Sequence, residues 1–419
     1  MIRAVAISFL LFAGILSAAD AGDLSPPLSL SIPNFVLNGG FPHWKVCREQ
    51  VRNNLADCNV LIIGESTSTG HGSFFQNTSG DARSGAFANQ LANILRSFGI
   101  NAQTNSISGN SHIAPYGKFD TRVRQNGWVA DNANFTFGGS AWKAADDTAL
   151  VFDPADRASY PNLSPVMTDT LDVYYHELAS GGDSLLVDTG GAPICTIHTT
   201  GATTAFSKAT CSTSLGANTY RLRCAGAHNC IFNTIVTRNS AIREVSVLNG
   251  SADGATVGNF NVSTGFPWDT LPAIRKFAPA LCIIMDISND AYHRETTIPL
   301  YMAHLTELVS ACKASGDVLL MTGFPYAVVF PGPVTPSQFQ ASVSQYQAAV
   351  LAVAKSTKSP VWDTLATWGG YARDQNGWSK MGMNAGWNAS CCGMAGDKAH
   401  WSVANNVYVA TMITVMLLQ

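Results

Sequence analysis

This chain of 419 residues has few charged side chains. Asp, Glu, Lys and Arg together make up 13% of the sequence, and the formal net charge is -3. That charged fraction is about half of what soluble domains usually carry. No run of Lys or Arg occurs, so the sequence lacks the basic surface with which proteins bind nucleic acid or anionic membranes. We therefore expect neutral binding partners and no nucleic acid.

The sequence also lacks an apolar run of the about 20 residues that cross a bilayer as a helix. Its first apolar stretch, residues 4–16, follows Arg3 and precedes the small residues 17–21, which is the pattern of a cleaved secretory signal. A membrane anchor is the alternative, but this stretch is too short to span, and residues 407–418 are shorter again. We expect residues 1–21 to be a signal peptide and the mature protein to be secreted or periplasmic.

Metal-binding spacings are missing as well. His228 lies between Cys224 and Cys230, but no second histidine stands at the distance that a zinc site requires. We predict neither a metal nor a cofactor. The ten cysteines of an exported chain indicate disulfides instead, and Cys47 with Cys58 and Cys224 with Cys230 are the local pairs that we consider first.

The Gly-x-Ser-x-Gly nucleophile elbow of the α/β-hydrolases is also absent. A different serine stands out. Residues 60–63 form an apolar run that predicts a strand, and residues 64–70 then read Gly-Glu-Ser-Thr-Ser-Thr-Gly, which places Ser66 just past the strand. A serine in this place suits a nucleophile, although a serine in such a stretch taken alone is more typical of a turn or a helix N-cap.

A nucleophilic serine needs a histidine that takes its proton and a carboxylate that orients the histidine. Near the C-terminus the chain reads Asp397-Lys398-Ala399-His400, a spacing that puts carboxylate and imidazole within one turn. Such a pair is also common by chance on protein surfaces. Cys391 and Cys392 stand just ahead, where a bridge would brace this loop, or where two unrelated thiols would serve the structure.

An asparagine between these two segments follows another apolar run. Residues 281–287 predict a strand, and Asn289-Asp290 comes directly after it. A side-chain amide at a strand end can donate to a developing oxyanion. Asn and Asp are also typical of ordinary loop starts, because they tolerate the conformations that end strands.

The strand-end serine, the strand-end asparagine and the C-terminal Asp-x-x-His, in this order, resemble the SGNH or GDSL hydrolase family. The family's nucleophile block Gly-Asp-Ser-Leu-Thr-x-Gly corresponds to residues 64–70, with Glu65 in place of Asp. Its Gly-x-Asn-Asp block corresponds to residues 287–290, with Ile287 in place of Gly. Residues 397–400 match the Asp-x-x-His block in full.

The family's second block, an Asn and a Gly after the second strand, has two candidates here. One is Asn249 with Gly254, and the other is Asn105 with Gly109. We favour Gly254, because it follows an alternating predicted strand and lies one predicted helix ahead of Asn289. For both glycines, an ordinary turn is the alternative.

The resemblance implies a serine esterase mechanism. Ser66 would be the nucleophile, His400 the base, and Asp397 the carboxylate that orients it. The oxyanion would be bound by the backbone amides of Ser66 and Gly254 and by the side chain of Asn289.

The alternation of strands and helices predicts an α/β fold, with a parallel sheet covered by helices on both faces. The resemblance implies the three-layer α/β/α sandwich of the SGNH family, whose ligands would bind at the carboxyl ends of the strands. Helices are expected at residues 87–95, 268–277, 300–314, 335–354 and 407–418, and strands at 60–63, 245–247, 281–287 and 318–321.

Residues 116–244 show a different sequence pattern, in which short segments of alternating apolar and polar residues are separated by Gly-, Asn- and Ser-rich breaks. This pattern predicts an inserted antiparallel β-sandwich between hydrolase parts at residues 22–115 and 245–419. A jelly-roll-like insert in this place resembles the carbohydrate-binding module of certain carbohydrate esterases. Aromatic residues in or near it would stack on sugars or, more often, form core: Trp128, Trp142, Tyr174, Tyr175 and Tyr220.

We therefore expect a secreted esterase that hydrolyses short acyl esters, with acetate favoured, on a polysaccharide or oligosaccharide. A lipid-directed esterase or thioesterase is one alternative, although no long apolar lid or interfacial helix is visible. A glycan-binding protein without catalytic activity is the other. The oligomeric state is left open.

Overall fold

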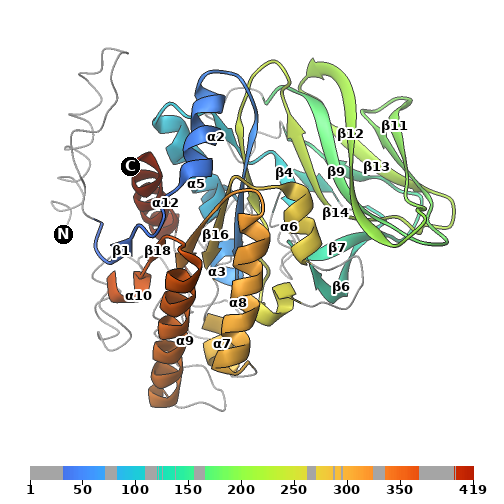
Figure 1. Cartoon of the computed structure of the whole chain (residues 1–419). Helices are drawn as coiled ribbons and strands as arrows, with labels where there is room; N and C mark the ends of the chain where they lie inside the picture. Colours follow the sequence, from blue (N-terminus) through green and yellow to red (C-terminus); the bar gives the residue numbers. More distant parts are fainter. Residues whose placement is uncertain are drawn as a thin grey trace.

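A computed structural model describes the fold. The described residues are 32–70, 83–108, 120, 122–124, 126–136, 138–154, 166–261, 270–285, 288–293, 296–323, 336–367, 401 and 403–419. A central sheet with helices on its two faces stands beside two antiparallel sheets (Figure 1). The predicted α/β class is confirmed.

The central sheet has seven strands. Their order is β1 (Phe35–Val36), β18 (Val361–Trp362), β17 (Asp317–Met321), β16 (Leu281–Met285), β2 (Cys58–Gly64), β15 (Val245–Asn249) and β3 (Ala102–Gln103). Neighbouring strands from β18 to β3 run parallel, whereas β1 pairs with β18 in the antiparallel direction. The sheet is therefore mixed, not wholly parallel as predicted, because a short segment ahead of the first helix adds to its edge.

The central strands are mostly apolar because helices cover both faces. Successive side chains of a strand point to opposite faces, so Leu61 and Ile63 enter one core while Val60 and Ile62 enter the other. One face is covered by α6 (Thr270–Phe277), α7 (Ser288–His293), α8 (Ile298–Lys313) and α9 (Pro336–Thr357), and the other by α2 (Pro42–Arg52), α5 (Phe87–Ser97) and α12 (Val403–Leu418). Each helix expected from the sequence lies among these seven, with shifted ends.

The chain between β3 and β15 of the central sheet forms two antiparallel sheets. One has β12 (Ala205–Gly216), β9 (Thr168–Glu177), β14 (Ile231–Arg238), β7 (Gly139–Ala144) and β6 (Trp128–Thr136), with β4 (Ser106–Ser108) paired to β14. The other has β11 (Pro193–His198), β10 (Ser184–Asp188), β13 (Tyr220–Ala225), β8 (Leu150–Phe152) and β5 (Val123–Arg124).

The two antiparallel sheets enclose a shared apolar core, to which one contributes Trp142 and Phe232 and the other Leu185 and Phe152. The five aromatic residues considered above for sugar stacking are at most 7% exposed. Stacking on sugars is therefore wrong for these side chains, and the core interpretation holds. Tyr174 reaches further, because its ring packs against Phe277 of α6 with 5.7 Å between ring centroids.

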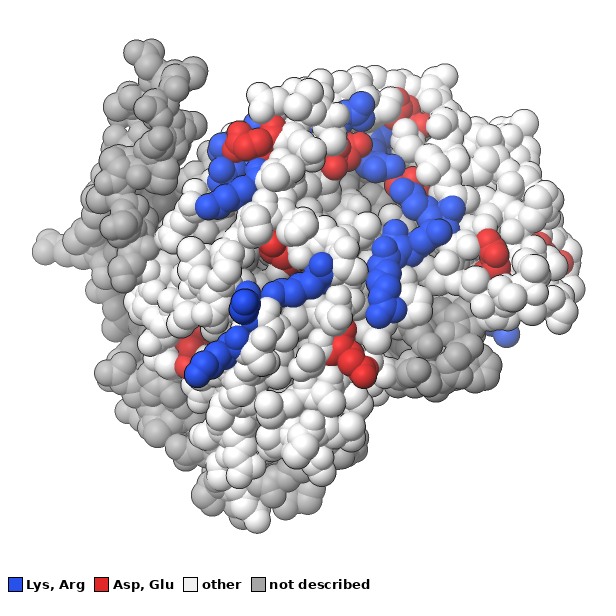
Figure 2. Space-filling view, in the orientation of Figure 1, with Lys and Arg blue, Asp and Glu red and all other residues white. Residues whose placement is uncertain are grey.

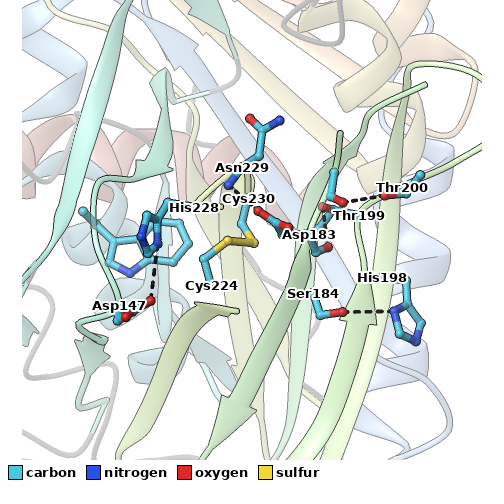
Figure 3. The surroundings of a disulfide bond; sticks show 12 residues. Asp147, Asp183, Ser184, His198, Thr199, Thr200, Cys224, His228, Asn229 and Cys230 are labelled. Atoms are coloured by element: carbon cyan, nitrogen blue, oxygen red, sulfur yellow. Dashed lines mark hydrogen bonds and ion pairs between the residues drawn. A yellow bond between two sulfur atoms is a disulfide. The ribbon is translucent and has the colours of Figure 1, made fainter. Parts of the chain in front are cut away.

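Disulfides pair eight of the described cysteines, and none of the described cysteines is free. Both predicted local pairs, Cys47–Cys58 and Cys224–Cys230, are confirmed. The second joins the end of β13 to the start of β14, beside Asp183 and His228 (Figure 3). The sequence did not predict the other two, Cys195–Cys211 and Cys282–Cys312. Cys391 and Cys392 lie outside the described residues.

Charged side chains are sparse on the face of the molecule seen in Figure 2, where wide areas carry neither sign. Among the described helices, none is long and apolar enough to cross a membrane. Within the same part of the chain, no group of His, Cys, Asp and Glu residues is arranged to hold a metal ion. The segment predicted to be a signal peptide, residues 1–21, lies outside the described residues.

Candidate active site

Ser66 stands where the sequence predicted it, at the carboxyl end of β2. The strand ends at Gly64, and the short helix α3 (Ser66–Thr69) begins two residues later. Gly64 is required there, since a Cβ at this position would lie 2.5 Å from the backbone oxygen of Met285 on the neighbouring strand.

The loop after β15 lies against α3. The side-chain amide of Asn249 donates to the backbone oxygens of Ser68 and Thr69, at 3.1 and 3.3 Å. The Thr69 hydroxyl donates to the Asp253 carboxylate at 2.7 Å. Gly254 follows directly, with a φ of +71° that favours glycine and open space around its Cα. These contacts bring the Asn249–Gly254 segment to the helix of Ser66, whereas the alternative Gly109 lies outside the described residues.

Asn289 lies in the first turn of α7 (Ser288–His293) rather than in a loop that closes a strand. The strand predicted over residues 281–287 ends at Met285. The backbone N–H of Asn289 donates to the Glu65 carboxylate, and its side-chain amide donates to the Ala255 carbonyl, both at 2.9 Å. A primary amide carries two N–H groups, so the second is available for an oxyanion.

Asp290, the residue after Asn289, is fully buried and holds the loop that follows Gly254. Its carboxylate accepts the backbone N–H of Val257 at 2.8 Å, at the start of the 3-10 helix η3 (Val257–Asn261). A hydrogen bond from a backbone N–H to a carboxylate is stronger than one to a neutral acceptor, so it holds a loop more tightly. The segments after β2, β15 and β16 are thus hydrogen-bonded to one another at one edge of the sheet.

Asp397 and His400 lie outside the described residues, as does Ile287. After His400, the structure describes Trp401 and then the chain from Val403 onward. Trp401 is buried and packs edge-to-face on Phe87, with 6.1 Å between ring centroids. Asn406 in the first turns of α12 donates to the backbone oxygen of Gly85 at 2.9 Å, in the 3-10 helix η1 (Arg83–Gly85). The two contacts fasten Trp401 to the first residue of α5 and the first turn of α12 to η1, and α5 also contacts α3.

Two hollows lie among the described residues at different edges of the central sheet. A small one of about 20 Å³ is lined by Thr69, Arg83 and Asn249 behind α3, and has room for about one water. A larger one of about 390 Å³ is lined by Cys58 and Ala280, where β2 and β16 begin. The larger hollow is therefore at the amino edge of the sheet, away from Ser66, and takes no part in the candidate site.

No protein-family model matches the chain, and no curated protein matches it in sequence. Among solved structures, the chain is similar to a peptidoglycan O-acetylesterase, with 16% identity, 90% of this chain and 95% of that chain covered, and a TM-score of 0.61. An acetylxylan esterase from Geobacillus stearothermophilus matches with 19% identity, 42% and 73% covered, and a TM-score of 0.27.

A third similar structure is a carbohydrate esterase family 2 enzyme with a carbohydrate-binding domain from Corynascus thermopiles (Myceliophthora fergusii). It has 13% identity, with 70% of this chain and 99% of that chain covered, and a TM-score of 0.27. The likeness to the O-acetylesterase extends over both the central sheet and the antiparallel sheets, since it covers 90% of the chain. The α/β fold that the sequence resemblance implied is confirmed.

Proposed function

We propose that this chain, which has the fold expected of the SGNH hydrolases, is a secreted serine esterase that removes short acyl groups, acetate foremost, from a polysaccharide or oligosaccharide. One observation carries the proposal. The loops of Ser66, Gly254 and Asn289 meet at the carboxyl edge of the sheet, linked through Glu65 and Asp253. Such linked loops can hold the hydrogen-bond donors in place before the reaction. Donors that are already in place stabilise the oxyanion without having to reorganise.

In this mechanism His400 takes the proton from the Ser66 hydroxyl as the oxygen attacks the ester carbonyl, and Asp397 holds the imidazole in the required tautomer. The anchoring of Trp401 against Phe87 supports these roles. It fixes the chain one residue after His400 beside a helix that contacts α3.

The tetrahedral oxyanion is bound by the amides of Ser66 and Gly254 and by the free N–H of the Asn289 side chain. Collapse of the intermediate breaks the bond to the sugar oxygen, which takes the proton from His400 and departs as the free sugar hydroxyl, while the acyl group stays on Ser66. Water, deprotonated by His400, then attacks the acyl-serine; the acyl group leaves as the carboxylic acid, and His400 returns the proton to the Ser66 oxygen.

The substrate class follows from the rest of the chain. Its low charge fits a neutral glycan better than a nucleic acid. We assign residues 116–244 to a jelly-roll-like, carbohydrate-binding β-sandwich inserted between hydrolase parts at 22–115 and 245–419. The structure similar over 90% of the chain is that of a peptidoglycan O-acetylesterase, which supports an acetylated glycan here. Disulfides in all three parts support an extracellular location after removal of residues 1–21.

Hydrolysis of p-nitrophenyl acetate by the oxidised protein, beside its Ser66→Ala variant, tests the proposal. We expect Ser66→Ala to lose at least about three orders of magnitude in kcat, as other nucleophile variants do. Ser68→Ala is the matched control, since Ser68 lies in the same helix and its hydroxyl donates to the Glu65 carbonyl at 2.7 Å. It should keep turnover within about tenfold, as expected when only one structural hydrogen bond is lost.

Two outcomes would redirect the assignment. A folded wild type without turnover would make the chain a glycan-binding protein that has lost catalysis. Activity that rises steadily along a series of longer acyl chains would indicate a lipid-directed esterase or thioesterase. If Ser66-dependent turnover is found and favours acetate, assays with acetylated oligosaccharides identify the sugar.

A further inference from the structure

The antiparallel sheets contact the candidate site directly. Ser108 ends β4, which pairs with β14 of the six-stranded sheet, and its side chain is fully buried. The Ser108 hydroxyl donates to the backbone oxygen of Asn249 at 2.5 Å. One residue further along, the backbone N–H of Gly138 donates to the backbone oxygen of Gly250 at 3.1 Å. Gly138 belongs to the turn between β6 and β7.

These two contacts depend on a close approach between Ser108 and Gly138. Gly138 has a φ of +82°, and a Cβ built on it would lie 2.6 Å from the Cβ of Ser108. Only glycine leaves room for the turn to reach Gly250 while Ser108 reaches Asn249. The six-stranded sheet therefore holds two successive carbonyls of the loop that follows β15.

The loop after β15 also holds α3 through the side chains of Asn249 and Asp253. The Asn249 side chain donates to the carbonyls of Ser68 and Thr69, and Asp253 accepts the hydroxyl of Thr69. Hydrogen bonds thus run from the antiparallel sheet through Asn249 to the helix of Ser66. Asn249 is only 8% exposed, so this path is largely shielded from competing water.

We infer that Ser108 is a positioning residue of the esterase, and that the antiparallel sheet, besides the carbohydrate binding proposed above, holds part of the catalytic centre in place. The inference rests on the proposed function. By fixing the carbonyl of Asn249, Ser108 sets where the rest of the loop, and with it the Gly254 amide, stands relative to Ser66. A misplaced oxyanion donor lowers the rate of the chemical step more than it weakens binding of a small ester.

Ser108→Ala tests this inference on p-nitrophenyl acetate. We expect kcat to fall about tenfold, less than the 10²- to 10³-fold cost of removing an oxyanion donor outright, with KM changed by less than about twofold. Gly138→Ala should have the same signature, since its Cβ would displace Ser108 and break both contacts. Melting temperature is measured alongside, so that losses of folded protein are separated from losses of rate.

Thr237→Val is the matched control. Thr237 is also fully buried on β14, and its hydroxyl donates to the backbone oxygen of Asn105 at 3.2 Å, so it makes the same kind of contact at the same junction. In the described part of the chain, Thr237 makes no hydrogen bond to the loop after β15, so Thr237→Val should lower stability without lowering kcat. Equal kcat values for Ser108→Ala and wild type, or equal losses for Ser108→Ala and Thr237→Val, would overturn the inference. A wild type without Ser66-dependent turnover would overturn the proposed function as well, so the two failures are distinguishable.

Discussion

The carboxylate of Glu65 accepts the backbone N–H of Asn289 at 2.9 Å, just beyond the ends of the paired strands β2 and β16. Glu65 is 3% exposed and directly precedes Ser66. It therefore joins the turn that carries Ser66 to the turn that carries Asn289. The resembled family has Asp at this place, where this chain has Glu65.

Replacing Glu65 tests the importance of this link. Glu65→Ala removes a buried acceptor of the Asn289 N–H, which costs about 1–3 kcal/mol and lets the turn move. We expect a kcat about tenfold lower on p-nitrophenyl acetate, because the oxyanion donor is less well placed. Glu65→Gln, which keeps an oxygen acceptor of the same length, should retain more activity than Glu65→Ala. Full kcat in the alanine variant would contradict the prediction.

Asn289→Ala removes the proposed oxyanion donor itself. Steady-state kinetics should show kcat lower by about 10²- to 10³-fold with little change in KM, since the donor acts on the transition state. Asn261→Ala serves as the control, because its amide also donates to a backbone carbonyl, that of His304 at 3.1 Å, and it is 6% exposed. If both variants lost kcat equally, Asn289 would be only a structural residue.

The disulfides should contribute unequally to stability. Cys282–Cys312 links β16 to α8 across 30 residues, whereas Cys224–Cys230 spans 6 residues. Closing the longer loop restricts the unfolded chain more, and the expected contributions are about 4 and about 2 kcal/mol. Urea unfolding of the two double-alanine variants measures both. A larger loss for the shorter loop would show that native-state packing, rather than chain entropy, dominates.

Glu244 gives stability a dependence on pH. Burial raises its pKa to about 7 and the Asp57 carboxylate adds to the rise, while the Asn239 N–H, Arg238 and Arg96 oppose it. A carboxyl whose folded-state pKa exceeds its unfolded value of about 4.5 stabilises the fold fully below that pH, and the contribution is lost as pH rises through about 7. Glu244→Gln should therefore melt at least about 2 °C above wild type at high pH.

The comparison at low pH completes this test. At about pH 4, below both pKa values, wild type holds the proton that glutamine mimics, so the two melting temperatures should agree. A constant difference across the whole pH range would mean that Glu244 does not titrate as its burial requires.

Much of the candidate site could be predicted from the sequence, because its signals are local. An apolar run predicts a buried strand, and a Gly- and Ser-rich segment after it predicts a tight turn into a helix, so Ser66 could be placed without knowing its neighbours. Cys47–Cys58 and Cys224–Cys230 could be guessed for the same reason, since their partners are close in the chain. Asp397 and His400 remain predictions.

Other features depended on which segments became neighbours. Tyr174 and Tyr175 point to opposite faces of β9, and both are buried because the second antiparallel sheet covers one face and α6 covers the other. The polar strand β12, with few apolar positions, could not be recognised without its partner β9. Cys195–Cys211 likewise joins two strands, β11 and β12, and the spacing of these cysteines in the sequence does not predict that the strands are close.

The sequence by itself determined the α/β class, the strand ends that carry Ser66 and Asn249, and the change of texture that marks the antiparallel region, since each follows from short-range patterns of apolar and turn residues. Only the tertiary structure decided that Glu65 would bind Asn289 and that Ser108 would bind Asn249. Those contacts join residues 224 and 141 positions apart, and a hydrogen bond over such a separation exists only once the packing of the sheets has brought its two ends together.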